Sequence, residues 1–235
     1  MNLLLLEPTD FIGPNRARID GRRHAHVCNI HRAGLGDQLK VGVLEGNMGR
    51  GQIIRLDQQH LELEVSLDQP PPPQLPLTLL LALPRPKMLR RIFQSCATLG
   101  VAELILINSY RVEKSYWQTP FLAEDKIREQ LILGLEQGMA TQLPQITLRK
   151  RFKPFVEDEL PALIDGKRAL VAHPYHAQPC PRNIEQPCVL AIGPEGGFIP
   201  YEIEKLADTG FTAIEIGQRI LRVESAITAL CAKLF

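Results

Sequence analysis

Hydrophobic and polar positions follow two different periods along the chain, and the change falls near residue 70. Before that point, apolar and polar residues alternate in short segments such as residues 38–43 and 61–65. Glycines punctuate these segments, at positions 34, 36, 42, 46, 49 and 51. Alternation with period two, broken by glycine turns, is typical of short antiparallel strands. We therefore predict a small β-barrel over residues 1–69.

From residue 75 onward, buried strands alternate with helices. Residues 75–83 are almost all apolar, as in a strand covered on both faces. Between Met88 and Leu99 apolar residues recur at helical spacing, and Gly100 offers a stop. Further strands are expected at residues 102–107, 169–172, 189–192 and 213–216, and further helices at residues 122–139, 153–164, 200–208 and from about 222. This order predicts an α/β domain over residues 75–235, with a mostly parallel sheet and helices on both faces.

The segment QPPPPQ at residues 69–74 separates the two patterns. Proline cannot donate a ladder hydrogen bond, and a proline run favours the extended polyproline form. We therefore expect the boundary between the two domains here.

Composition changes this picture little, because 45% hydrophobic and 23% charged residues are typical of a soluble globular protein. The apolar run at residues 3–6 is too short for a membrane span or a signal peptide, so a cytoplasmic protein is expected. Five scattered cysteines without a CxxC pair indicate reduced thiols rather than a disulfide framework or a zinc ribbon. Arginines outnumber acidic residues before residue 56, which fits either a surface that follows phosphates or a solvated arginine-rich face.

Two segments carry the candidate chemistry: IGPEGGF at residues 192–198 and IGQRILRVESA at residues 216–226. Each follows a predicted strand and precedes a helix, which places it at the carboxyl edge of the sheet, where open α/β folds bind ligands. The glycines at 193, 196, 197 and 217 let the backbone approach a flat ligand. A single such loop is explained by turn formation alone. Two such loops after neighbouring strands favour a binding site.

Several other sites are excluded by their spacing. Neither loop contains the GK[ST] of a phosphate loop or the GxGxxG of a dinucleotide site, and no GxSxG elbow is present. Two sets of histidines, residues 24, 26 and 31 and residues 173 and 176, lack carboxylate or cysteine partners at ligand spacing. We expect no metal, and interpret most of these histidines as polar surface groups and His173 as a strand-end residue.

The two loops resemble those of the small-subunit rRNA uridine-N3 methyltransferases, the RsmE group of the SPOUT class. The resemblance extends to HVCNIHRAGLGDQLKV, in which His26, Arg32, Gly36 and Asp37 match, and to residues 99–101, Arg111, residues 136–137, Pro144 and residues 173–174. It implies a PUA-like barrel, a trefoil-knot domain that binds S-adenosylmethionine, and a homodimer acting on ribosomal RNA or the assembled small subunit. This chain departs from the family at Ser95, Thr98, Tyr110 and Ala140, where the family has lysine, glutamate, glutamate and arginine.

The resemblance also implies roles for particular residues. Arg222 is expected to stabilise negative charge on the target base, and Glu224 or Glu195 to orient it or accept its proton. Structural alternatives are that Glu195 holds its own loop through backbone amides and that Arg222 pairs with Glu224. The expected cofactor-binding residues are His173, Ile192, Gly193, Pro194, Glu195, Gly196, Gly197, Ile216, Gly217, Ile220, Leu221, Arg222, Ser225 and Ala226.

Arg16, Arg22, Arg23 and Arg32 are expected to contact RNA phosphates, which fix position rather than sequence. Two other functions stay open at this point. The chain can be a methyltransferase for a different RNA, or a non-catalytic RNA-binding paralogue.

Overall fold

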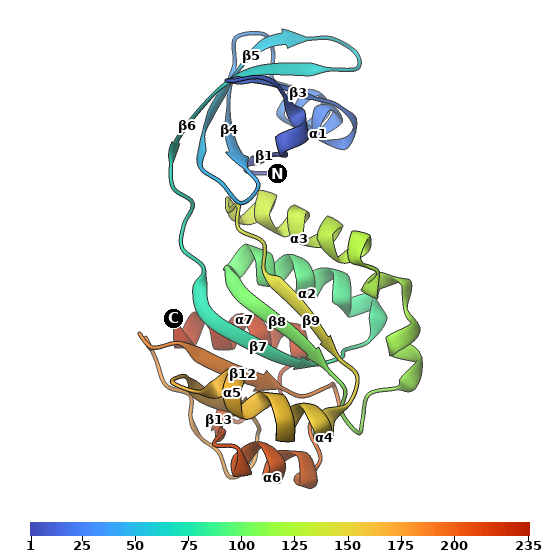
Figure 1. Ribbon diagram of the computed structural model, residues 1–235, viewed down its shortest axis with the longest axis vertical. Coiled ribbons are helices and arrows are strands. Elements are labelled where there is room, and N and C mark those ends of the chain that lie inside the picture. Colours follow the sequence, from blue (N-terminus) through green and yellow to red (C-terminus); the bar gives the residue numbers. More distant parts are fainter. The chain divides into compact units, whose positions relative to one another are not determined.

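The computed structural model describes residues 1–235 and divides them into two compact units. The first unit comprises Met1–Pro73 and Leu131–Leu143, and the second comprises Gln74–Gln130 and Pro144–Phe235. The division falls inside one helix, α3 (Glu124–Gly138), so the chain contributes a second, helical segment to the first unit. The two units are described in turn (Figure 1).

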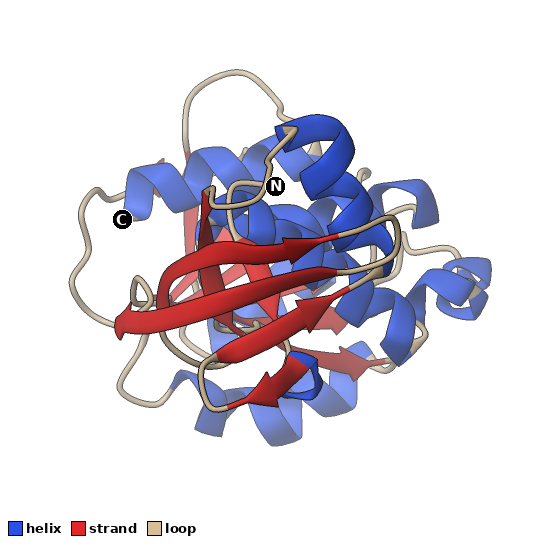
Figure 2. Ribbon diagram, turned by 90° about the horizontal axis from the view of Figure 1, so that it is seen from above, coloured by secondary structure: helices blue, strands red, loops and turns tan.

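The first unit is built on a curled six-stranded sheet that forms a half-barrel (Figure 2). Its strands, in sheet order, are β1 (Leu4–Leu6), β4 (Gln38–Val43), β5 (Met48–Leu56), β6 (Leu61–Gln69), β3 (Arg16–Ile19) and β2 (Phe11–Gly13). Strand β1 pairs parallel to β4, whereas the other pairs are antiparallel. The prediction of an entirely antiparallel barrel was wrong at this edge. A parallel pair needs a long connection rather than a hairpin, and the chain between β1 and β4 provides one.

Glycines allow close approach inside this sheet. A Cβ atom at Gly49 would lie 1.8 Å from the backbone oxygen of Ser66 on the neighbouring strand, and one at Gly51 would lie 2.9 Å from Val41 Cγ1. Glycine in a strand commonly marks such close backbone approach. Val41 on β4, Ile53 on β5 and Leu63 on β6 belong to the hydrophobic core of the unit.

A helical segment that the sequence pattern did not predict lies between β3 and β4. It consists of α1 (Gly21–His26) and a π-helical turn (Val27–His31), and it ends at Arg32 in the left-handed conformation with φ 52°. Val27 belongs to the core. His24 is buried, which corrects its interpretation as a surface group; its Nε2 lies 2.9 Å from the carbonyl oxygen of Asp57. A buried ring nitrogen is tolerated there because the backbone supplies its partner.

The second unit is a seven-stranded, wholly parallel sheet with helices on both faces. In sheet order its strands are β11 (Gln178–Pro179), β13 (Thr212–Glu215), β10 (Arg168–Ala172), β12 (Cys188–Ile192), β7 (Leu75–Ala82), β8 (Val101–Ile107) and β9 (Gln145–Arg149). This confirms the predicted α/β class and five of the strands. The pattern missed β9 and the two-residue β11, because neither carries a long apolar run.

Helices α2 (Pro86–Leu99) and α7 (Val223–Leu234) pack against each other behind the sheet in Figure 1. Helix α6 (Pro200–Asp208) follows the loop after β12. The predicted helix at residues 153–164 is confirmed as one uninterrupted helical segment, made of α4 (Phe152–Pro154), a π-helical turn (Phe155–Glu159) and α5 (Leu160–Ile164). Pro161 favours the change of hydrogen-bond register, since it has no N–H to donate back along a helix. Short 3₁₀ turns occur at Pro8–Asp10, Lys114–Gln118 and Pro120–Leu122.

All five cysteines are free thiols, and four of them are buried, as predicted. Burial raises the pKa of Cys188 and Cys231 to about 12, so both remain protonated at neutral pH. None of the helices combines the length and the apolar composition that a membrane span requires.

Candidate functional site

The candidate loops leave the same edge of the parallel sheet, where the carboxyl ends of its strands lie. One loop follows β12 and the other follows β13, but β10 lies between these two strands. The prediction that the loops end neighbouring strands was therefore wrong. Two strand spacings separate the roots of the loops by about 10 Å. His173 directly follows β10, so it lies between the starts of the two loops.

The loop after β12 folds tightly on itself. The Gly197 N–H donates to the Pro194 carbonyl at 2.7 Å, and Gly197 has φ +73°. A Cβ atom at Gly193 would lie 2.9 Å from the backbone nitrogen of Phe198, so only glycine fits. Phe198 is buried and lies near Phe152, with ring centroids 6.4 Å apart. Gly193 is therefore required by the loop itself, while Gly197 leaves open space where a side chain would be.

The same loop is fastened to the loops that follow β7 and β8. The Glu195 carboxylate accepts the backbone N–H of Arg85 at 3.1 Å, and the Arg111 guanidinium donates to the Gly196 carbonyl. The Glu195 carboxylate thus binds a backbone amide of another loop. The alternative that it binds backbone amides of its own loop was wrong. An exposed carboxylate that already has this partner has less freedom to act as a proton acceptor.

Glu202, on the first turn of α6, is a residue that the sequence analysis missed. Its side chain is buried; one carboxylate oxygen accepts the N–H of Tyr110 at 2.7 Å and the other accepts the N–H of Ile199 at 3.0 Å. A glutamate at the third helical position after a proline start is a typical capping residue, so the signal was present in the sequence. What the sequence did not show is that this carboxylate also holds the loop after β8.

The loop after β13 is open and partly apolar. Gly217 has φ +133°, and its N–H donates to the Glu215 carboxylate at 2.6 Å. The side chain of Ile220 is 79% exposed and that of Leu221 is 39% exposed. A Cβ atom at Gly217 would meet nothing within 4 Å. Exposed aliphatic side chains beside an open glycine backbone are typical of a ligand-binding surface rather than a solvated turn.

Arg222 occupies the N-cap position of α7, with an extended backbone. Its side chain is exposed and makes neither a hydrogen bond nor an ion pair, so the suggested pair with Glu224 does not form. Glu224, Ser225 and Ala226 lie in the first turn of the same helix. The guanidinium is therefore available to a ligand.

His173 continues the edge of the sheet between the two loops. Its N–H donates to the Ile214 carbonyl at 3.0 Å, and its ring meets that of Tyr175 edge-on at 5.6 Å. Burial, and then the nearby His176, lower the pKa of His173. The imidazole is accordingly neutral at physiological pH, which suits contact with an uncharged or cationic ligand.

Of the expected RNA-binding arginines, three are already paired within the first unit. Arg22 makes two hydrogen bonds to buried Glu136, at 2.9 and 2.8 Å, and Arg23 makes two to Asp10, at 2.6 and 2.7 Å. Arg16 donates to Glu62 at 2.6 Å. The fourth, Arg32, is exposed and has no side-chain partner.

Glu62 is the centre of a larger cluster on the outer face of the half-barrel. Besides Arg16, its buried carboxylate accepts two hydrogen bonds from Arg18, at 3.1 and 2.8 Å, and Arg55 lies 3.8 Å away. These hydrogen bonds, that of Arg18 first and then that of Arg16, lower the pKa of Glu62. The carboxylate is therefore ionised throughout the physiological range.

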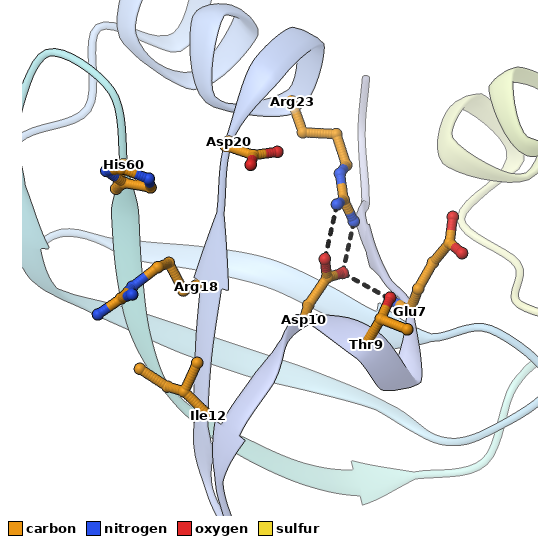
Figure 3. Close-up of a pocket in the computed structure, with 8 residues that line it drawn as sticks. All are labelled: Glu7, Thr9, Asp10, Ile12, Arg18, Asp20, Arg23 and His60. Atoms are coloured by element: carbon orange, nitrogen blue, oxygen red, sulfur yellow. Dashed lines mark hydrogen bonds and ion pairs between the residues drawn. The ribbon is translucent and has the colours of Figure 1, made fainter.

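A hollow of about 460 Å³ also lies in the first unit (Figure 3). Its lining mixes acidic and basic side chains with Thr9 and Ile12: Glu7, Asp10, Asp20, Arg18, Arg23 and His60. The Arg23–Asp10 pair crosses one wall, as the dashed lines in Figure 3 show. Because the charges are mixed, the hollow does not favour either an anion or a cation. It is also separate from the loops of the parallel sheet, which belong to the second unit.

The sequence and the fold were compared with known proteins. A family model described as the RNA methyltransferase domain matches residues 70–234. The chain is 28% identical to the ribosomal RNA small subunit methyltransferase E of Treponema pallidum, over 99% of this chain and 90% of that protein. It is 30% identical to the protein of the same name in Mesomycoplasma hyopneumoniae, over 68% of this chain and 70% of that protein.

A solved structure of a ribosomal RNA small subunit methyltransferase E from Neisseria gonorrhoeae, bound to S-adenosyl methionine, superimposes with a TM-score of 0.74. The alignment covers 99% of this chain and 96% of that one, at 19% identity. It confirms the fold, a SPOUT-type α/β domain with a smaller N-terminal barrel. The chain belongs to the RNA methyltransferase family and, within it, to the RsmE group of small-subunit ribosomal RNA methyltransferases.

Proposed function

We propose that the protein transfers a methyl group from S-adenosylmethionine to N3 of a uridine in small-subunit ribosomal RNA. The observation that carries this proposal is the open edge of the parallel sheet, where a glycine turn after β12 and a loop after β13 with exposed aliphatic side chains lie on either side of β10. Support comes from the family, from the names of the relatives, and from the S-adenosyl methionine in the Neisseria gonorrhoeae structure.

The residues at this edge fit the cofactor. The backbone beside Gly197 and Gly217 borders open space, so carbonyl and amide groups there can contact adenosine directly. Ile220 and Leu221 are apolar surfaces that a purine ring would cover. Ile192, Gly193, Pro194, Ile216, Ser225 and Ala226 complete the proposed binding residues, with His173 between the loops.

The chemistry follows from the properties of uridine. S-adenosylmethionine, when bound, supplies a methyl group already activated by the sulfonium. Uridine N3 must lose its proton, and the negative charge then spreads to O2 and O4. Arg222 is the proposed stabilising group, because its unpaired guanidinium is always charged and presents a planar set of donors. Glu224 also has no side-chain partner, so we favour it over the engaged Glu195 as orienting group or proton acceptor.

We further propose that residues 1–69 serve RNA binding and residues 75–235 methyl transfer, in a cytoplasmic homodimer. Arg32 is the favoured phosphate contact among the four arginines, since the others already have acidic partners. The substrate is ribosomal RNA or the assembled small subunit.

The experiment is a methyl-transfer assay with the purified protein and S-adenosylmethionine carrying a labelled methyl group. Naked small-subunit rRNA, assembled small subunits and bulk tRNA are offered separately, each prepared from cells that lack this protein. We expect labelled 3-methyluridine, identified by mass spectrometry of nucleosides, from one of the first two substrates. Label in tRNA alone would indicate a different RNA target. Binding of RNA without any transfer would indicate the non-catalytic paralogue.

A further inference from the structure

We propose that Tyr110 is a stacking platform for an unpaired base of the RNA substrate, next to the uridine that is methylated. The inference rests on the proposed function for its ligand, an RNA strand. It goes beyond that function in assigning a contact with a nucleotide other than the target uridine.

Tyr110 stands at the tip of a tight turn. The turn follows β8, and the N–H of Val112 donates to the carbonyl of Ser109 at 3.1 Å. Val112 and Ser109 are buried, whereas the two residues between them, Tyr110 and Arg111, are exposed. The turn therefore carries an exposed aromatic residue followed in the chain by an arginine. This is the pair of side chains that proteins use for single-stranded nucleic acid, where bases stack on aromatic rings and cations meet phosphates.

The turn is held in place from several sides. The N–H of Tyr110 donates to the buried carboxylate of Glu202, and Trp117 donates to the side chain of Asn108 at 2.9 Å. Tyr110 is thus an exposed ring on a fixed support, and it loses little freedom when it binds.

The position of the turn relates it to the proposed methyl-transfer site. Arg111 donates to the carbonyl of Gly196 in the loop after β12, so the turn adjoins one of the two cofactor loops. Strand β8 is separated from β12 by β7 alone, and the carboxyl ends of all three lie at the same edge. The spacing of two strands is about 10 Å, a distance suited to a nucleotide beside the target rather than the target itself.

Tyr110 is highly exposed for a tyrosine side chain. Tyr110 is 79% exposed, against 43% for Tyr201 on helix α6 of the same unit. Arg85, whose backbone amide binds Glu195, adds a second exposed arginine to the neighbouring loop. A strand that stacks on Tyr110 can therefore bring its phosphates toward the exposed side chain of Arg85, while Arg111 joins the turn to the loop after β12.

The test uses the full chain in steady-state methyl transfer, with the RNA substrate identified above. We expect Tyr110→Ala to raise KM for RNA about tenfold with kcat nearly unchanged, as for loss of one base stack. Tyr110→Phe retains the ring and is expected to match the wild type. Tyr110→Glu replaces the ring with a negative charge, which RNA repels, and is expected to raise KM at least as much as alanine. Tyr201→Ala is the matched control and should leave KM unchanged.

Other outcomes overturn the inference. An unchanged KM in Tyr110→Ala, or a KM raised equally in Tyr110→Phe, excludes stacking. A change of oligomeric state in Tyr110→Ala, measured by light scattering, assigns the ring to contact between two copies instead. Affinity for S-adenosylmethionine, measured by calorimetry, should stay constant in all variants and verifies that the fold is intact. If neither the wild type nor any variant transfers methyl groups, the proposed function fails. The stacking inference fails separately, when methyl transfer is intact but KM for RNA does not respond to loss of the ring.

Discussion

The half-barrel unit and the open edge of the parallel sheet differ in whether their arginine side chains have acidic partners. On the half-barrel, Arg16, Arg18 and Arg55 surround one buried carboxylate, and on α1 of the same unit Arg22 and Arg23 each make two hydrogen bonds to a carboxylate. At the open edge, Arg222 has no side-chain partner, and Ile220 lies exposed beside it along the chain. Paired charges mainly fix the fold, while unpaired ones are available for a ligand. The contrast therefore separates arginines that build the scaffold from those that serve function.

The largest effect is expected from Arg222. Arg222→Ala should lower the single-turnover rate of methyl transfer by about 10²–10³-fold, as for removal of one donor to a developing negative charge. Affinity for S-adenosylmethionine should change little. Arg219→Ala, on the same loop, serves as the control and is expected to be nearly silent. Equal losses in both variants would mean that the loop needs positive charge in general, and would remove the special role of Arg222.

Two glycines of one loop provide the next comparison. At Gly193 an added Cβ atom would meet the backbone of Phe198 at 2.9 Å, whereas at Gly196 it would meet the flexible side chain of Arg111 at 2.9 Å. Backbone cannot move aside as a side chain can, so Gly193→Ala should reduce affinity for S-adenosylmethionine about tenfold or more, and Gly196→Ala less than about threefold. Calorimetry measures both. The reverse order would show that Gly196 and not Gly193 governs the shape of the loop.

The cluster at Glu62 gives a prediction about pH. Its pKa is lowered in the folded protein, so ionised Glu62 adds stability above its ordinary value of 4.5, and this contribution is lost as the pH falls through the folded pKa. The free energy of unfolding of the wild type should therefore decline in acid more steeply than that of Glu62→Gln. Glu64→Gln, on the same strand and exposed, should follow the wild type. Parallel pH profiles in Glu62→Gln and the wild type would contradict the cluster.

The smallest effect is expected from Arg32. Arg32→Ala should weaken RNA binding a few-fold and reduce the slope of log affinity against log salt by about one, as for loss of one phosphate contact. Arg23→Ala should instead lower the stability of the first unit, because it leaves Asp10 without its partner. Filter binding at several salt concentrations, with thermal unfolding in parallel, measures both. If Arg23→Ala changed the salt slope and Arg32→Ala did not, the separation of scaffold and functional arginines would be wrong.

Much of the second unit followed from its pattern. The apolar runs at β7, β8, β10 and β12 predicted strands that the structure confirms, because a strand buried on both faces has almost no polar positions. The glycine loops were found for a similar reason, since their composition is unlike that of any packed element. The helix at residues 153–164 was predicted without its π-helical turn, because a proline within an apolar stripe changes the hydrogen bonds without disturbing the stripe.

The sequence by itself determined the fold class, five of the seven strands of the parallel sheet, and the two loops that identify the family. Only the tertiary structure decided that β10 lies between the loops, that β1 is parallel to β4, and which arginines have acidic partners. The physical reason is the separation along the chain of the residues that interact. Periodicity and turn chemistry are local properties of the chain, whereas an ion pair such as Arg22–Glu136 joins residues 114 positions apart and exists only after folding.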